Sequence, residues 1–221
     1  MTGKSPFVVA IDGPAASGKG TLARRLAERF GLAHLDTGKL YRATALLVLD
    51  AGADPADPEA ATAAARRVEP LMLSDPRLSS EPAANASSIV AAIPAVRAAL
   101  LAMQREFAAR PPPPSRGAVL DGRDIGTAVC PDADLKLFVT ASPEARAERR
   151  LRELRGRGAA AIYGDVLQDM KERDARDSLR RVAPLAAAPG AVIIDTTRLD
   201  ADQVLEQASE IIARALVAHG R

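Results

Sequence analysis

A glycine-rich segment, GPAASGKGT at residues 13–21, is the feature that most limits what this chain can fold into. It follows a short apolar run, residues 7–11, and precedes a segment with helical periodicity, residues 21–30. Glycines let the backbone curve so that successive N–H groups point at anionic oxygens, and the next helix adds the positive end of its dipole. Lys19 supplies a mobile positive charge. The segment therefore predicts a strand, a phosphate-binding loop and a helix, in that order.

Length, composition and charge narrow the class of protein further. At 221 residues and 48% hydrophobic content, the chain can bury one substantial core with an inserted subdomain. No apolar stretch approaches the roughly 20 residues that cross a bilayer, and the first residues lack the apolar region of a signal peptide. A net charge of +2 argues against a general nucleic-acid binder. We therefore expect a cytoplasmic protein that binds small molecules, with neither a nucleic acid polymer nor a membrane as partner.

Short apolar runs alternate with helical periodicity along most of the chain. The runs predict five buried strands, at residues 7–11, 33–35, 118–120, 135–139 and 192–194. Helical periodicity is clearest at residues 21–30, 39–49, 96–109, 143–154, 165–182 and 201–218. This alternation predicts an α/β fold with a five-stranded parallel sheet covered by helices.

Two segments interrupt the alternation. Residues 52–94 are rich in Ala, Pro, Asp and Ser, and we interpret them as an insertion into a core formed by residues 1–51 and 95–221. The second interruption is RGRG at residues 155–158, a basic turn with two glycines between two predicted helices. We expect a mobile lid at about residues 154–164, with arginines such as Arg157 closing over phosphate. A plain turn between helices would have the same composition, so both interpretations stay open.

Polar side chains follow two of the predicted strands at their carboxyl ends, where open parallel sheets bind ligands. The chain reads DTGKLYR at residues 36–42 and DGRD at residues 121–124. Asp121 is the expected acid on the metal side, because it closes an apolar run. Arg42 and Arg123 are expected to face one cleft with an anion between them, since two arginines otherwise repel. A structural turn held by Asp–Arg pairs is the alternative.

A third cluster of charge lies on the predicted helix at residues 165–182. Arg173, Arg176, Asp177 and Arg180 are spaced i, i+3, i+4 and i+7, so they would share one helix face. An exposed, ion-paired helix would show the same spacing. The basic turn upstream favours a functional role, in which these arginines neutralise charge on a phosphoryl group.

Together these segments resemble the bacterial cytidylate kinases, and the G-K-G-T ending of the loop is typical of small-molecule and nucleoside monophosphate (NMP) kinases. The resemblance extends through nearly the whole chain. Its matching pieces are GPAASGKGT (13–21), LDTGKLYR (35–42), NASS (85–88), VRAAL (96–100), DGRDIGT (121–127), PDADLKLFV (131–139), KERDARD (171–177) and VAPL (182–185).

The resemblance implies a three-layer P-loop core with an inserted NMP-binding region and a short lid. It also implies a monomer that transfers the γ-phosphoryl group of MgATP to CMP or dCMP. Together with the motifs described above, it implies candidate residues for catalysis, for Mg²⁺, for ATP and for CMP. The catalytic set is Lys19, Arg123, Arg173 and Arg180, and Thr21 would hold Mg²⁺, with Asp121 acting through water. The ATP set is Gly13, Pro14, Ala15, Ala16, Ser17, Gly18, Lys19, Gly20, Thr21 and Arg157. The CMP set is Asp36, Thr37, Arg42, Ser88, Arg97, Asp121, Arg123, Asp124, Arg173, Asp177 and Arg180, with Ser88, Arg97 and Asp124 at the cytosine.

Some features depart from the family pattern and leave other functions open. A strand-rich hairpin usual before NASS is missing around residues 74–81, and Thr37 stands where serine is common. A kinase for UMP, AMP or a small alcohol such as shikimate is the enzyme alternative. The non-enzyme alternative is a nucleotide-dependent switch, against which the lack of an Asn-Lys-x-Asp motif argues.

Overall fold

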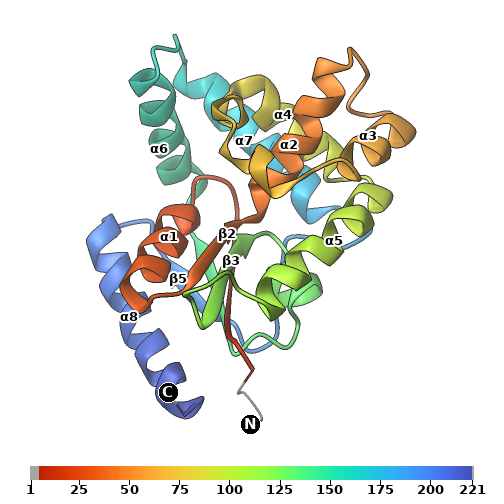
Figure 1. Ribbon diagram of the computed structural model, residues 1–221. Coiled ribbons are helices and arrows are strands. Elements are labelled where there is room, and N and C mark those ends of the chain that lie inside the picture. Colours follow the sequence, from red (N-terminus) through yellow and green to blue (C-terminus); the bar gives the residue numbers. More distant parts are fainter. Residues whose placement is uncertain (1–4, 221) are drawn as a thin grey trace. The chain divides into compact units, whose positions relative to one another are not determined.

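Five strands alternate with helices along residues 5–220, the part of the chain that the computed structural model describes (Figure 1). The strands are β1 (Phe7–Asp12), β2 (Ala33–Asp36), β3 (Gly117–Gly122), β4 (Leu135–Thr140) and β5 (Val192–Asp195). The α-helices are α1 (Lys19–Phe30), α2 (Thr37–Asp50), α3 (Pro58–Ala65), α4 (Glu81–Val90), α5 (Pro94–Ala109), α6 (Pro143–Gly156), α7 (Tyr163–Ser178) and α8 (Ala201–Ala218). Two 3-10 helices, η1 (Pro70–Ser74) and η2 (Pro76–Ser79), and one π-helical turn, η3 (Ile125–Val129), complete the order.

The strands form one sheet in the order β2-β3-β1-β4-β5. β1 pairs in parallel with β3 on one side and with β4 on the other, and β4 pairs in parallel with β5. The five predicted strands and the α/β class are therefore confirmed. Because the strand order reverses at β1, the carboxyl ends of the central strands form the edge at which open α/β sheets bind ligands.

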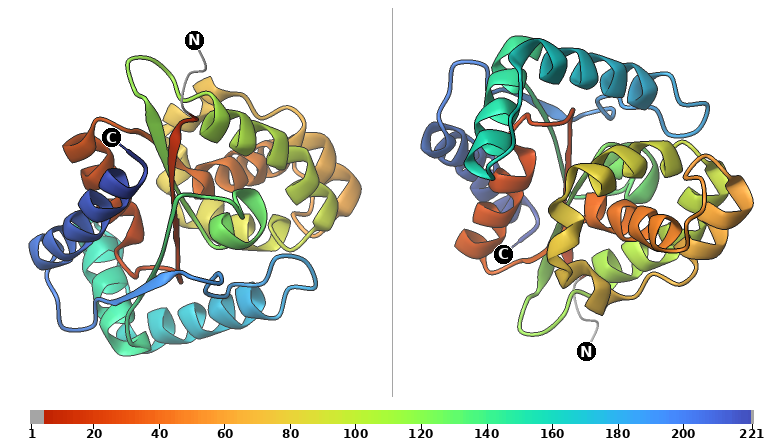
Figure 2. Two further views of the ribbon diagram at one scale, coloured as in Figure 1. Left: turned by 90° about the horizontal axis from the view of Figure 1, so that it is seen from below. Right: turned by 90° about the horizontal axis from the view of Figure 1, so that it is seen from above.

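One face of the sheet is covered by α1 and α8, which lie side by side (Figures 1 and 2). Alternate residues of β1 (Phe7, Val9 and Ile11) are fully buried in this layer. Leu22 and Leu26, one helical turn apart on α1, pack into the same cluster. This packing fixes the start of α1, and with it the segment at residues 13–18, against the end of β1.

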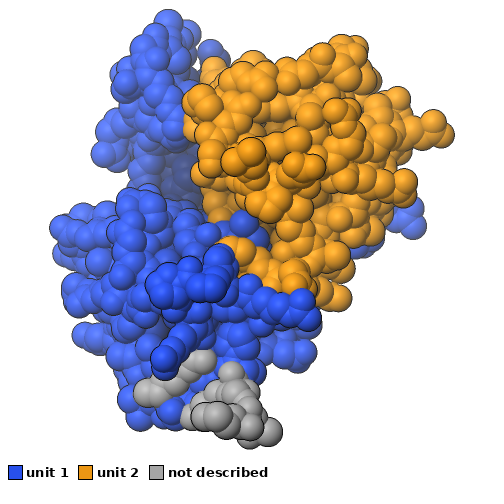
Figure 3. All heavy atoms as spheres, in the orientation of Figure 1, with its two compact units in different colours: residues 1–35, 108–221 blue, residues 36–107 orange. Residues whose placement is uncertain are grey.

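Contacts along the chain define two compact units: residues up to 35 together with residues from 108 onward, and residues 36–107 (Figure 3). The first unit holds the sheet apart from the last residue of β2. The second is helical and has its own core, which includes Leu40, Val48, Val90 and Leu100. It contains the predicted insertion, residues 52–94. Residues 70–79 form η1 and η2, and residues 37–107 contain no strand, as expected from the missing hairpin.

The helix predicted at residues 165–182 is wrong at its end, because α7 ends at Ser178. Leu179 and Val182 are exposed, so a further turn would bury no apolar surface. Ala183 has a positive φ of 50° and precedes a proline, which disfavours helical backbone. Arg180 therefore lies beyond the helix and does not share its face by periodicity.

No single helix in residues 5–220 is long and apolar enough to cross a membrane. The pair α4 and α5 passes that test of length and composition only when taken together, and it bends by 103° at its break.

Candidate functional site

The glycine-rich segment forms the predicted loop between β1 and α1. Gly13 has φ +149°, and a Cβ there would lie 2.0 Å from the carbonyl oxygen of Val139, so only glycine fits. Gly18 has φ +90° and is the N-cap residue of α1. Lys19 is buried and its Nζ donates to the carbonyl oxygen of Pro14 at 3.1 Å. The lysine thus lies folded across the loop at the positive end of the helix dipole, where an anion would bind.

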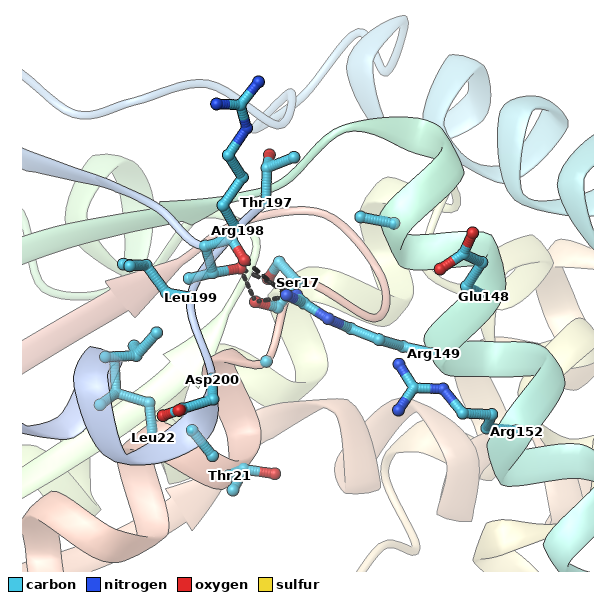
Figure 4. Close-up of a pocket in the computed structure, with 15 residues that line it drawn as sticks. Ser17, Thr21, Leu22, Glu148, Arg149, Arg152, Thr197, Arg198, Leu199 and Asp200 are labelled. Atoms are coloured by element: carbon cyan, nitrogen blue, oxygen red, sulfur yellow. Dashed lines mark hydrogen bonds between the residues drawn. The ribbon is translucent and has the colours of Figure 1, made fainter.

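A pocket of about 560 Å³ opens beside this loop (Figure 4). Ser17, Gly18, Thr21 and Leu22 line it from the loop and α1, Arg149 and Arg152 line it from α6, and residues 196–201 line it after β5. Volumes of this order accommodate small-molecule ligands and cofactors. The pocket therefore adjoins the loop with a mixed apolar and charged lining, in which three arginines outnumber the acids Glu148 and Asp200.

Arg149 crosses from α6 to the opposite wall of the pocket (Figure 4). Its Nη1 donates to Thr196 Oγ1 at 2.8 Å, and its Nη2 donates to the Thr196 carbonyl oxygen. Burial, together with the nearby Arg152, lowers the pKa of the Arg149 guanidinium from its usual value. Arg149 and Arg152 were not among the predicted residues of the ATP site, although their i, i+3 spacing on a helix was visible. Arg157 was predicted there, and it pairs with Glu153 of α6 at 2.6 Å.

Asp121 ends the apolar part of β3, as predicted, and is buried. Its Oδ1 lies 2.7 Å from Nε2 of His34, a residue to which the sequence analysis gave no role. Its Oδ2 faces the first turn of α1, where a Cβ on Gly20 would lie 3.6 Å away. The structure therefore brings Asp121 to Gly20 of the loop, while Thr21 lines the pocket.

Asp12, the last residue of β1, is a buried acid that the sequence analysis missed. Its carboxylate accepts hydrogen bonds from the backbone N–H groups of Ile125 (2.7 Å) and Gly126 (2.8 Å). Asp12 therefore fixes the start of η3, the π-helical turn that follows Arg123 and Asp124. The available signal was an acid at the end of a buried strand, next to the glycine-rich loop.

Burial raises the pKa of Asp12 to about 6 from its ordinary 3.8, and the negative charge of Asp124 adds to this effect. The two backbone hydrogen bonds and the Lys19 ammonium oppose it without cancelling it. The folded state therefore binds a proton that the unfolded state has released between these pH values. As pH rises from about 4 to about 6, this residue lowers the free energy of unfolding, in total by about 3 kcal/mol.

We expect Asp12→Asn to remove this pH dependence, because an amide does not ionise. Urea unfolding of both proteins from pH 4 to pH 7 gives the difference between their free energies of unfolding. The wild-type protein should lose up to about 3 kcal/mol relative to the variant over this range. Parallel curves would show that Asp12 does not titrate as the structure implies. Other titrating groups are common to both proteins and cancel in the difference.

Three of the predicted arginines surround one carboxylate. Asp177 on α7 is 1% exposed and accepts from Arg123 Nε at 2.9 Å and from Arg180 Nη2. Burial raises the pKa of Asp177, but the charges of Arg123, Arg180 and Arg173 more than offset this and lower it below its usual value. Of the predicted cluster, Arg173, Asp177 and Arg180 come together with Arg123, although Arg180 does so from beyond the helix. Arg176 is exposed and is not among the arginines that act on Asp177.

Five of the predicted residues lie in the second unit. Asp36 is the N-cap residue of α2 and Thr37 is its first residue. Arg42 Nη1 donates to the carbonyl oxygen of Leu78 at 3.3 Å, and Ser88 Oγ donates to that of Asn85 at 3.1 Å. The Arg97 guanidinium lies over the ring of Tyr41, 5.6 Å from its centre. Tyr41, adjacent to Arg42, was not among the predicted site residues.

Comparison with known proteins identifies the family. A family model described as cytidylate kinase matches residues 9–214. The chain belongs to the cytidylate kinase family. A cytidylate kinase of Rhodospirillum rubrum is 60% identical over 207 residues, which cover 94% of this chain and 97% of that protein. A cytidylate kinase of Methylocella silvestris is 59% identical over 209 residues, covering 95% of each chain.

Membership of the cytidylate kinase family confirms the predicted family and the predicted enzyme class, a kinase among the transferases. Among solved structures, a protein of Thermus thermophilus has a TM-score of 0.50 at 20% identity, covering 96% of this chain and 99% of that one. An uncharacterised protein of Eubacterium ventriosum has a TM-score of 0.50 at 14% identity, covering 94% and 96%. These two likenesses support the fold alone.

Proposed function

We propose how the residues of this chain carry out the reaction of its family, transfer of the γ-phosphoryl group of ATP to CMP or dCMP. The observation that carries the proposal is the phosphate loop with buried Lys19, in a chain that matches the cytidylate kinase model over residues 9–214. We place the reaction in the cytoplasm and assign it to a monomer.

ATP is the donor, and the loop at residues 13–21 holds its phosphates. Backbone N–H groups of the loop and the N-terminus of α1 face the anionic oxygens, and Lys19 exchanges its bond to Pro14 for the β- and γ-phosphates. The adjoining pocket takes the nucleoside, and Arg149 and Arg152 form its wall on α6. Arg157, on the segment after α6, is our candidate lid residue.

The acid at the end of β3 fits a magnesium ion. Mg²⁺ prefers oxygen ligands and is usually held by one or two carboxylates together with substrate phosphates and water. Asp121 offers a carboxylate beside the loop, and no group of three or more His, Cys, Asp or Glu side chains placed to hold a metal occurs in residues 5–220. We assign Asp121, through water, and Thr21 to the cation that accompanies ATP. When bound, Mg²⁺ neutralises charge that builds up between the β- and γ-phosphates.

The acceptor is a nucleoside monophosphate whose phosphate is bound by arginine. Arg123, Arg173 and Arg180 gather around Asp177, and arginine binds phosphate through charge-assisted, often bidentate hydrogen bonds. We also assign phosphate contacts to Thr37 and Arg42. Asp36, which precedes Thr37 in the chain, remains a candidate residue for CMP. The cytosine contacts are assigned to Ser88 and Arg97, which are buried in the second unit, and to Asp124.

The chemistry requires positioning and neutralisation of charge more than proton transfer. The attacking oxygen belongs to a phosphate that is already anionic at neutral pH, so no strong general base is needed. Lys19 and the three arginines stabilise the charge that develops during transfer, which is the largest demand of this reaction.

A panel of acceptors with MgATP tests this function. ADP release is followed with CMP, dCMP, UMP, AMP and shikimate in turn, and a reaction without acceptor reports ATP hydrolysis. We expect CMP and dCMP to stimulate ADP release far more than the other three. Preference for UMP, AMP or shikimate would overturn the assignment of the cytosine contacts. If no acceptor stimulates turnover, a nucleotide-dependent switch becomes the better account.

A further inference from the structure

We propose that His34 is a positioning residue, which fixes the carboxylate of Asp121 in the orientation that the MgATP complex requires. The inference rests on the proposed function, in which Asp121 serves the cation through water. It goes beyond that proposal because it assigns a role to a residue outside the loop, the arginine cluster and the cytosine contacts.

The geometry joins two neighbouring strands at the carboxyl end of the sheet. His34 lies in β2, Asp121 lies in β3, and the two strands are adjacent. Nε2 of His34 lies 2.7 Å from Oδ1 of Asp121, with the side chains 22% and 5% exposed. A carboxylate accepts but does not donate, so the histidine carries its hydrogen on Nε2 and donates. Such a bond is strong in a site from which water is largely excluded.

The consequence concerns the other carboxylate oxygen. The terminal torsion of an aspartate is broad and roughly two-fold, so an unrestrained carboxylate samples a range of orientations. A hydrogen bond to Oδ1 restricts that rotation. It directs Oδ2 to the first turn of α1, where a Cβ on Gly20 would lie 3.6 Å from it. Groups that orient a metal's ligands in this way commonly change metal affinity by about 10- to 100-fold.

A purely structural role is the competing explanation, since the same bond also joins β2 to β3. The chain provides a matched control, because its second histidine makes a similar contact at the amino ends of the strands. His219 Nδ1 lies 2.9 Å from Oδ1 of Asp134, the residue immediately before β4. A general effect of losing a His–Asp pair should therefore appear in both variants, whereas an effect on the magnesium complex should appear only at His34.

The experiment measures ATP affinity by titration calorimetry, once with excess Mg²⁺ and once with EDTA. The proteins compared are the wild type, His34→Ala, His34→Gln and His219→Ala. We expect His34→Ala to reduce the gain in affinity from Mg²⁺ by about tenfold while ATP affinity in EDTA stays within about twofold. His34→Gln should restore most of the gain, because its amide can donate to Asp121. His219→Ala should leave the gain unchanged.

Several results would overturn the proposal. One is that His34→Ala loses ATP affinity equally with and without Mg²⁺. Another is that Mg²⁺ raises the ATP affinity of His34→Ala as much as that of the wild type. A third is that His219→Ala loses the Mg²⁺-dependent gain as much as His34→Ala does. If His34→Ala does not fold, His34→Phe keeps a ring of similar size without the donor and takes its place. A wild-type protein with no Mg²⁺-dependent gain in ATP affinity would contradict the proposed cation site itself. If the wild type shows this gain in ATP affinity and the His34 variants keep it, only the role of His34 is contradicted.

Discussion

Replacing Lys19 with methionine should lower turnover by about 10²- to 10³-fold or more while leaving the fold intact. Lys19 is the only lysine in the loop, and its Nζ lies against the carbonyl oxygen of Pro14. Methionine has a similar length and fills the same space, but it carries no charge for the β- and γ-phosphates. Because this charge acts most strongly on the transferring group, the loss should appear mainly in kcat. The measurement is steady-state ADP release with CMP and MgATP.

Lys39→Met is the matched control for this substitution. Lys39 also donates to a backbone carbonyl oxygen, that of Leu73 at 3.2 Å, but it is exposed and lies outside the loop. It should retain near-normal turnover. Circular dichroism and thermal unfolding establish that both variants are folded. Near-normal turnover in Lys19→Met would contradict the proposed mechanism, whatever its effect on KM.

The sequence was sufficient to predict the parts of this protein that local rules determine. The strands, the loop and most helices depend on apolar periodicity and on glycines at fixed positions, so the prediction and the structure agree. The exceptions are α3 and α4, which lie in a segment interpreted only as an insertion, and the end of α7, where the apolar residues Leu179 and Val182 prolonged the helical pattern. In the structure both side chains are exposed, so continuing the helix through them would bury no apolar surface.

The remaining features depend on contacts between residues distant in the sequence. Asp12 and Ile125 are 113 positions apart, and His34 and Asp121 are 87 positions apart. Nothing in the local sequence shows that a lone histidine on β2 faces a particular acid on β3. That pairing follows from the order of strands in the sheet, which the alternation of strands and helices does not specify. The family resemblance indicated candidate residues for binding the substrates. It did not indicate the contacts of Asp12 and His34, which hold such residues in place.

Replacing Asp177 with asparagine should destabilise the protein by about 3–5 kcal/mol at neutral pH. The carboxylate is 1% exposed and balances part of the charge of Arg123, Arg173 and Arg180. Asparagine keeps the volume but removes the negative charge that Arg123, Arg173 and Arg180 face at this position. Its NH2 group also places a donor where Asp177 accepts hydrogen bonds from arginine. The measurement is the free energy of urea unfolding. Asp202→Asn is the control, because its ion pair with Arg25 is exposed and should contribute less than about 1 kcal/mol.

The pH dependence of this effect has a definite sign. The pKa of Asp177 is lowered in the folded protein, so its stabilising contribution is present above the pKa of the unfolded chain, about 3.9. That contribution is lost as pH falls through the lower, folded-state value. The gap in stability between wild type and Asp177→Asn should therefore be constant near neutrality and narrow below about pH 4. A gap that widens with acid would mean that the arginines do not control this carboxylate.

Inorganic phosphate tests whether the arginine cluster is open to a phosphate group. In Asp177→Asn an external anion can replace the missing charge, so phosphate should raise the melting temperature of the variant more than that of the wild type. The phosphate loop is the same in both proteins, so the difference between the two shifts reports on Arg123, Arg173 and Arg180. Equal shifts would mean that the cluster is closed to phosphate, and the acceptor site would then have to be sought elsewhere. A larger shift in the variant would place an anion among these arginines, as phosphoryl transfer to a nucleoside monophosphate requires.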